Sequence, residues 1–222
     1  MGAGWFVTGT DTGVGKTVVS CALLHALRAS GMRAVGMKPV ASGCVHSVQG
    51  LLNEDVEALL QSGDPAATRD EISLYRFEPA IAPHIAAARA GVEIDLAAIA
   101  ARHRDLARRY DAVVVEGAGG WLVPLGRSTS FADLAQALGL PVVLIVGMRL
   151  GCINHALLSA ESIARCGLRL EGWVANRIDP DMACFEENLE SLRERMDARL
   201  MGVVAHRFPP DPARIGRDLL LR

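Results

Sequence analysis

The fold is decided near the beginning of the chain by the stretch Gly9-Thr10-Asp11-Thr12-Gly13-Val14-Gly15-Lys16-Thr17. This stretch lies between a run of strand-forming residues and an amphipathic segment, which is the context that a phosphate-binding loop requires. Small residues let successive backbone N–H groups turn toward phosphate oxygens, and the N-terminus of the following helix adds positive potential. The loop therefore predicts that nucleotide phosphates bind to Gly13, Val14, Gly15 and Lys16, and that the Thr17 hydroxyl binds Mg²⁺.

The spacing of this loop departs from the common pattern at one position. Thr10 stands where the first glycine is usual, and Gly9 lies one residue earlier. The alternative interpretation is a glycine-rich turn between strand and helix that binds no ligand. Because Gly15-Lys16-Thr17 is in register with the expected helix start, the phosphate-binding interpretation is favoured.

The rest of the chain alternates between strand-like and helix-like segments. Runs rich in β-branched residues predict strands at 5–8, 34–38, 112–116, 142–146, 172–175 and 200–204. Apolar residues at helical spacing predict helices at 16–29, 53–60, 96–109, 131–138, 154–165 and 184–196. Because runs such as 112–115 are apolar at consecutive positions, the strands are expected to be buried on both faces of a mainly parallel sheet. The sequence thus predicts an α/β fold with one doubly wound sheet flanked by helices, of the P-loop NTPase type.

A single P-loop α/β domain is expected over residues 1–222, because half of the residues are hydrophobic and can form a full core. Three glycines, Gly31, Gly139 and Gly167, each follow a periodic stretch, as a helix end in the left-handed conformation requires. The segment 39–53 is expected to be a loop. It follows a strand that ends in Lys38, at the carboxyl edge where an open parallel sheet binds ligands.

Composition excludes several classes of protein. The formal charge is −2 and the two signs are interspersed, so no basic surface is expected to bind nucleic acid or an anionic membrane. The five cysteines show no C-x-x-C pair, which argues against a disulfide framework or a zinc site and favours the cytoplasm. The longest apolar stretch, 140–146, is too short to span a membrane, and the N-terminus shows no targeting segment.

A second glycine-rich segment follows the buried strand at 112–116 and reads Glu116-Gly117-Ala118-Gly119-Gly120. A carboxylate suits Mg²⁺, and glycines allow the backbone to approach phosphate closely. The alternative is an ordinary acid at a strand end that faces water. Asp55 is a third candidate metal ligand, although the residues alone favour an acid that stabilises the first turn of its helix.

Lys16 and Lys38 are the only lysines in the chain, whereas arginine is abundant. Arginine replaces lysine readily on a solvated surface, but less well as a compact charge against a phosphate. Both lysines lie at the expected ligand edge of the sheet. They are therefore candidate functional residues, although a solvated charge at a strand end is the simpler interpretation of Lys38.

Several motifs occur in order between Phe6 and about Asn176. After the phosphate loop come Lys38-Pro39-Val40-Ala41-Ser42-Gly43, Pro83-His84, Val115-Glu116-Gly117-Ala118-Gly119-Gly120-Trp121, Leu150-Gly151-Cys152-Ile153-Asn154-His155 and Gly172-Trp173-Val174-Ala175-Asn176. In this order they resemble the dethiobiotin synthetase family. The resemblance implies that a cyclic urea is closed on 7,8-diaminononanoate with CO₂ and ATP, giving dethiobiotin, ADP and phosphate, in a homodimer.

The resemblance also implies roles for individual residues. Around the substrate carbamate and the transferred phosphate it places Thr12, Lys16, Lys38 and Ser42. It assigns Mg²⁺ to Thr17, Asp55 and Glu116, and further ATP contacts to Gly117, Ala118, Gly119 and Asn176, the last facing the nucleobase. Phosphorylation would activate the carbamate, and phosphoryl transfer is catalysed mainly by positioning and by cations.

The segment from Gly151 to Asn154 carries two interpretations. Exposed N–H groups at the start of a helix can bind the carboxylate tail of the substrate, and the residues that would do so are Gly151, Cys152, Ile153 and Asn154. Alternatively, Asn154 caps its own helix. The resemblance favours the first interpretation, because it implies that this segment binds the substrate tail across a dimer interface.

Two other functions stay open at this stage. One is a partition-type switch ATPase, which carries a signature lysine where this chain has Asp11. The other is a GTPase-like module, because Asn176-Arg177-Ile178-Asp179 approximates a guanine-reading motif. The departures from the dethiobiotin synthetase pattern are Arg177, where an acid is frequent, and Ala205, where proline is common. The adenine contacts are thus the part of the site that the sequence defines least.

Overall fold

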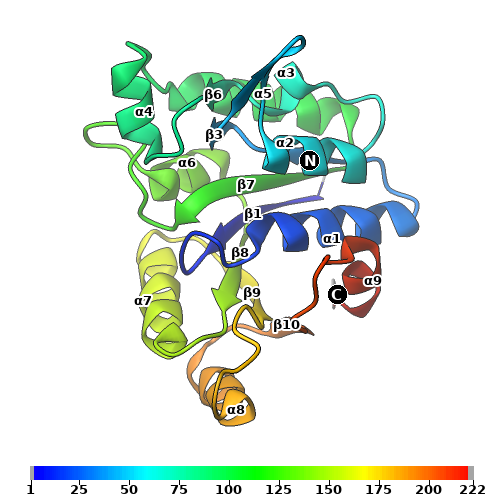
Figure 1. Cartoon of the computed structure of the whole chain (residues 1–222), viewed down its shortest axis with the longest axis vertical. Coiled ribbons are helices and arrows are strands. Elements are labelled where there is room, and N and C mark those ends of the chain that lie inside the picture. Colours follow the sequence, from blue (N-terminus) through cyan, green and yellow to red (C-terminus); the bar gives the residue numbers. More distant parts are fainter. Residues whose placement is uncertain (1–2, 220–222) are drawn as a thin grey trace.

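The computed structural model describes residues 3–219, and six of their strands form one parallel sheet in the order β10-β9-β8-β1-β7-β2 (Figure 1). The strands are β1 (Ala3–Gly9), β2 (Ala34–Met37), β7 (Ala112–Gly120), β8 (Val142–Gly147), β9 (Leu170–Asn176) and β10 (Leu200–Val204). Every pairing in this sheet is parallel. The predicted parallel α/β sheet is confirmed.

The helices are α1 (Lys16–Ala29), α2 (Glu54–Ser62), α3 (Arg69–Ile72), α4 (Pro83–Arg89), α5 (Leu96–Arg109), α6 (Phe131–Leu138), α7 (Cys152–Arg165), α8 (Phe185–Arg195) and α9 (Pro212–Asp218). Those predicted from helical spacing agree with the structure within about two residues at each end. Gly31, Gly139 and Gly167 all have positive φ angles at helix ends, as expected. Within residues 3–219, no helix combines the length and the apolar character needed to cross a membrane.

The sheet is covered on both faces, as the apolar runs predict. Leu144 of β8 and Trp173 of β9 belong to a cluster with the apolar residues of α7 and α8. Their neighbours Ile145 and Val174 belong to the larger cluster that includes α1. Because successive strand residues point to opposite faces, these two clusters lie on the two sides of the sheet. The sheet is therefore doubly wound.

The expectation of a loop at 39–53 was wrong. Val40–Ser42 forms β3, which pairs with β6 (Tyr75–Phe77), and β4 (Val45–Ser47) forms a hairpin with β5 (Gly50–Leu52). These strands are three residues long, so they carry too few positions to show a period. The β3–β6 pairing also joins residues far apart in sequence, and local patterns carry no information about such contacts.

Helix α9 was not predicted, and it packs against α1 beside the C-terminal strand (Figure 1). Gly216 makes this close approach possible, because a Cβ atom at that position would lie 2.4 Å from the backbone oxygen of Ala22. The helix thus packs directly on α1, which begins at Lys16 of the phosphate loop.

Candidate active site

The phosphate loop joins β1 to α1 at the carboxyl edge of the sheet. Gly13 and Gly15 have φ angles of 72° and 87°, in the left-handed region that favours glycine. Gly15 is the N-cap of α1, so the first N–H groups of that helix open toward the loop. A Cβ atom on Gly9 would lie 2.6 Å from Val14 Cγ2, which explains why the glycine missing at Thr10 is supplied one residue earlier.

Lys38 is buried at the end of β2 between two carboxylates. Its Nζ donates to Glu116 Oε1 at 2.6 Å and to Asp55 Oδ2 at 2.7 Å, and it lies 3.4 Å from the backbone oxygen of Gly117. Only 5% of the Lys38 side chain is exposed, and the Glu116 side chain is fully buried. The interpretation of Lys38 as a solvated charge was therefore wrong, because this lysine is held inside the site by two acids.

Thr17 brings the phosphate loop to the same two carboxylates. Its Oγ1 lies 2.7 Å from Asp55 Oδ1 and 2.9 Å from Glu116 Oε1. The second oxygen of Glu116, Oε2, is buried and has no hydrogen-bond partner among residues 3–219. Three oxygen-bearing side chains from three elements thus converge, with one buried acceptor left over.

Asp55 lies in the first turn of α2, as the helix-dipole interpretation requires. The cap itself is Asn53, whose side chain accepts the N–H groups of Asp55 and Val56. This leaves the Asp55 carboxylate free to reach across to Lys38 and Thr17. The same residue therefore occupies the helix terminus and the site, and the two interpretations do not exclude each other.

Glu116 was expected at the end of its strand, and this was wrong. It lies within β7, which continues to Gly120. Gly119 has a φ angle of 66°, and a Cβ atom built there would lie 3.4 Å from Thr12 Oγ1. The backbone of Gly117, Ala118 and Gly119 therefore runs beside the phosphate loop, close enough for both loops to contact one ligand.

The two lysines have opposite electrostatic environments. Burial alone would lower the pKa of Lys38, but the Glu116 and Asp55 carboxylates outweigh burial and raise this pKa above its ordinary value. For Lys16, burial and the charge of Lys38 lower the pKa to about 8. Burial would raise the pKa of Asp55, yet Lys38 holds it below the ordinary range. Lys38 is thus a permanent cation, whereas Lys16 titrates near neutral pH.

Ser42 lies at the end of β3, the short strand that follows Lys38 in the sequence. Its Oγ is buried and lacks a hydrogen-bond partner in the part of the chain that the structure describes. Its backbone oxygen accepts the side-chain amide of Asn53 at 3.1 Å. The hydroxyl is thus held in place and available to a ligand. The sequence did not predict that Asn53 holds Ser42 as well as capping α2, because the pattern of a helix cap does not show whether the side chain makes a second contact.

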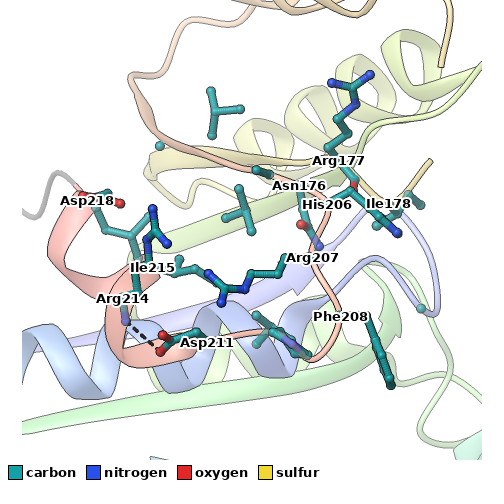
Figure 2. A pocket seen from close by; sticks show the side chains of 18 residues that line it. Asn176, Arg177, Ile178, His206, Arg207, Phe208, Asp211, Arg214, Ile215 and Asp218 are labelled. Carbon is teal, nitrogen blue, oxygen red and sulfur yellow. Dashed lines mark hydrogen bonds between the residues drawn. The ribbon is translucent and has the colours of Figure 1, made fainter. Parts of the chain in front are cut away.

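A cavity of about 640 Å³ opens beside the phosphate loop, between the end of β9 and the segment that joins β10 to α9 (Figure 2). Asn176 and Ala205 line it, as the sequence suggested for a nucleobase site. The sequence analysis missed the residues after Ala205, since no local pattern predicts where a connecting segment folds; those that line the cavity include His206, Arg207, Phe208, Asp211 and Arg214.

Asn176 connects this cavity to the phosphate loop. Its Nδ2 donates to the backbone oxygen of Val14 at 2.8 Å, and its side chain is buried. A Cβ atom on Gly15 would lie 2.1 Å from that nitrogen, so only glycine fits there. One of the two Nδ2 N–H groups is used on Val14, so Oδ1, which can only accept a hydrogen bond, and the second N–H are left to contact a ligand.

The guanine-reading alternative finds no support in the position of Asp179. Its Oδ1 accepts the N–H of Asp181 at 2.9 Å, and it does not line the cavity. Arg177 does line the cavity, but its guanidinium lies 4.8 Å above the Phe185 ring and donates to the backbone oxygen of Pro180. The unexpected arginine is therefore used in packing against α8.

The predicted substrate-tail segment forms the start of α7. Gly151, with a φ angle of 95°, is the N-cap, so the interpretation of Asn154 as the cap was wrong. Asn154 is the third residue of the helix and is exposed, whereas Cys152 is buried. The first N–H groups of α7 therefore face the carboxyl edge without a side-chain cap from Gly151, and Asn154 is free to contact another molecule.

Comparison with known families gives a consistent result. A family model described as an AAA domain matches residues 3–210. An ATP-dependent dethiobiotin synthetase of Nitrosospira multiformis is 53% identical over 219 residues, covering 99% of this chain and 93% of that protein. Another from Aromatoleum aromaticum is 54% identical over 217 residues, covering 98% and 96%.

Solved structures resemble the fold at much lower identity. The septum site-determining protein MinD of Pyrococcus horikoshii, complexed with Mg-ADP, has a TM-score of 0.55 at 15% identity, covering 97% of this chain and 93% of that one. The MinC:MinD complex of Aquifex aeolicus gives 0.57 at 14% identity, covering 98% and 86%. At this identity the likeness concerns the fold alone.

Proposed function

The chain belongs to the dethiobiotin synthetase family, and we propose that its phosphate loop and its two lysines carry out the steps that join 7,8-diaminononanoate to CO₂ with ATP. Its activity is ATP-dependent dethiobiotin synthesis, a step of biotin biosynthesis. The observation that supports this assignment of roles is the buried cluster in which Lys38 lies between Asp55 and Glu116, beside Thr17. The cluster joins a phosphate-binding loop to a fixed cation.

In the proposed reaction one amine of the substrate adds to CO₂ and loses a proton, which gives a carbamate. A carbamate oxygen then takes the terminal phosphoryl group of ATP and releases ADP. The second amine attacks the activated carbon, phosphate leaves with the C–O bonding electrons, and loss of a proton completes the cyclic urea. The protein need only hold the reactants in line and neutralise charge, as is general for phosphoryl transfer.

The lysines divide this work. Lys16 starts α1 behind the glycine-rich loop and would contact the outer phosphates of ATP. Negative phosphate charge beside Lys16 would raise this lowered pKa again, because it favours the charged form of the lysine. Lys38 keeps its charge at all physiological pH values and would stabilise the negative charge that develops on the transferred group. Thr12 and Ser42 would orient the carbamate, because Thr12 lies on the phosphate loop and the Ser42 hydroxyl, at the end of β3, is buried without a partner among residues 3–219.

The residues present suit Mg²⁺. This ion prefers oxygen ligands and is usually held by one or two carboxylates together with substrate phosphates and water. Thr17, Asp55 and Glu116 offer such a set, and Glu116 Oε2 is buried without a partner among the described residues. No group of three or more His, Cys, Asp or Glu suited to a metal occurs within residues 3–219. When bound, Mg²⁺ would neutralise charge on the ATP phosphates.

The nucleobase is assigned to the cavity beside Asn176. One N–H of Asn176 Nδ2 bonds Val14 and fixes the amide, and its Oδ1 would accept a hydrogen bond from an exocyclic amino group. Adenine carries such a group at this edge, whereas guanine presents a carbonyl oxygen there. This chemistry supports ATP over GTP.

A homodimer with shared active sites fits the surface of α7. Leu150 and Leu158 on this segment are 94% and 56% exposed, and Leu122, after β7, is 62% exposed. Exposed apolar side chains that form one continuous patch mark a surface that a partner covers, and these three residues are candidates for such a patch. We propose that the substrate tail binds Gly151, Cys152, Ile153 and Asn154 of one subunit while its amines reach the lysines of the other. We also propose that residues 1–222 act as one P-loop domain in the cytoplasm.

The central experiment incubates the purified protein with diaminononanoate, bicarbonate and MgATP and detects the cyclic urea by mass spectrometry. Product and ADP should appear together, and only when both diamine and bicarbonate are present, because the carbamate is the phosphoryl acceptor. Rapid ATP hydrolysis without the diamine, stimulated by a partner protein, would instead fit a switch ATPase.

The shared site has its own test. Lys38→Ala and Asn154→Ala variants should each be nearly inactive. When they are mixed under conditions of subunit exchange, both changes fall in one site of the heterodimer and the other site is intact, so activity should partly return. If mass measurement confirms exchange and activity stays absent, Asn154 acts in its own subunit's site.

A further inference from the structure

His84 carries a buried polar atom that the proposed reaction does not use. Its Nδ1 is buried and has no hydrogen-bond partner among residues 3–219, although the ring as a whole is partly exposed. A buried donor or acceptor without a partner costs folding free energy, so native proteins keep few of them. An unpaired nitrogen of this kind therefore indicates a ligand that completes the contact. Pro83-His84 is also one of the sequence motifs, and the proposed reaction gives it no role.

Contacts between neighbouring segments bring His84 to the side of the site that Ser42 forms. His84 is the second residue of α4, and α4 packs against β3, the strand that ends at Ser42. Just before this helix, the Pro79 oxygen accepts the Gly43 N–H at 3.1 Å, and a Cβ atom built on Gly43 would lie 3.4 Å from the Ala80 Cβ. Figure 1 shows α4 at the end of the molecule toward which the arrowheads of β1 and β7 point. His84 and Ser42 thus share the carboxyl edge, and each has a buried polar atom without a partner in the described part of the chain.

Ring closure releases a proton that the residues assigned to the reaction are poorly suited to take. When the second amine attacks, its lone pair forms the new C–N bond, phosphate leaves with the C–O electrons, and the nitrogen must lose a proton. Lys38 already carries its proton, and the Asp55 and Glu116 carboxylates are bonded to Lys38. Lys16 would be charged beside the ATP phosphates. A neutral imidazole, in contrast, accepts a proton readily near neutral pH.

We propose that His84 is a catalytic residue for ring closure: its Nδ1 accepts the proton of the attacking amine, and the partly exposed ring then releases this proton to water. The proposal rests on the proposed function, because it assigns a base to one of its steps. His84 lies on the same chain as Ser42 and Lys38, which would hold the reacting end of the substrate. The assignment therefore agrees with a substrate tail that is bound by α7 of the partner subunit.

The experiment follows ADP and dethiobiotin in a single turnover, with the protein in excess over ATP and with diaminononanoate and bicarbonate present. His84→Asn keeps a short polar side chain that can accept a hydrogen bond but cannot take up the proton. A general base typically contributes about 100-fold or more to its step, so dethiobiotin formation should slow by about that factor. ADP should still appear early, because phosphorylation of the carbamate precedes the step that needs the base. In the variant, ADP formation should thus run ahead of dethiobiotin formation.

Comparing the two products within one sample makes the result independent of how much of the variant is folded. His103→Asn is the matched control, since His103 is also a partly exposed histidine within a helix, in the middle of α5. This variant should keep both rates. The rate advantage of the unaltered protein over His84→Asn in ring closure should also shrink as the pH is lowered, because a protonated imidazole no longer accepts a proton.

Three results would overturn the proposal. They are dethiobiotin formation in His84→Asn as fast as in the unaltered protein, ADP and dethiobiotin that slow together in this variant, and a rate advantage that does not change with pH. In the first case water or the departing phosphate takes the proton, and in the other two His84 supports the site without accepting a proton. Dethiobiotin formation by the unaltered protein tests the proposed function separately.

Discussion

Replacing Lys38 by methionine tests the buried cluster most directly. The change keeps most of the side-chain volume but removes a cation that is 5% exposed and bonded to two carboxylates, one of them fully buried. Breaking a buried ion pair from one side leaves an uncompensated charge, which typically costs about 3–5 kcal/mol of folding free energy. Urea unfolding in the presence of a chelator should show a loss of that size.

The kcat of Lys38→Met should fall by more than the loss of folded protein alone would cause. A cation aimed at developing charge in a water-poor site contributes about 100- to 1000-fold to kcat, and nucleotide binding should be largely kept, because Lys38 lies on a different loop from Lys16. Excess Mg²⁺ should restore part of the lost stability, since it supplies charge to the same carboxylates.

Lys16→Met is the matched control. Burial and Lys38 already disfavour the charge of Lys16, so removing it should cost little stability and should chiefly weaken ATP binding. The reasoning is refuted if Lys38→Met unfolds at the same urea concentration as the unaltered protein in chelator. It is also refuted if the variant keeps full turnover.

The other predictions concern pH, the nucleobase and helix packing. Lys16 has a pKa of about 8 in the free protein, so ATP affinity should be constant below that pH and decline above it, because binding must then take up a proton; Lys16→Arg should remove the decline in a nucleotide titration. Asp179→Ala should leave the preference for ATP over GTP unaltered in turnover assays, whereas a GTP preference that collapses in this variant would show that guanine is read here. Gly216→Ala should lower the free energy of unfolding by about 1–3 kcal/mol, because the new methyl group meets the Ala22 oxygen at 2.4 Å; an unchanged urea midpoint would mean that α9 shifts freely.

The sequence predicts the sheet and the phosphate loop well because both depend on local patterns. The run at 112–115 is apolar at consecutive positions, which is typical of a strand that is buried on both faces of a sheet. The position of Lys38 was harder to predict. Its burial results from Asp55 and Glu116, which are 17 and 78 residues away in sequence. The family resemblance brought these residues together, whereas local physical reasoning favoured a ligand-binding role for Glu116 and left Lys38 and Asp55 with ordinary surface roles.

The cavity that we propose for the nucleobase was the part that the sequence defined least, for a physical reason. Its wall after Ala205 is an irregular segment followed by a short helix, and neither has a period. What places them is the fit of Gly216 against α1, a tertiary contact. The role of Asn154 was also hard to predict, because its position as third residue of α7 depends on where the helix begins.

The cavity beside the phosphate loop is lined by residues from Gly13 to Leu219, and this spacing has a consequence for synthesis of the protein in the cell. The phosphate loop leaves the ribosome well before the opposite wall of the cavity, which lies far later in the chain. A nascent chain can therefore form most of the sheet before it has a complete place for the nucleobase. Contacts that this cavity makes with a ligand can therefore stabilise the fold only after the segment that follows β10 has been made.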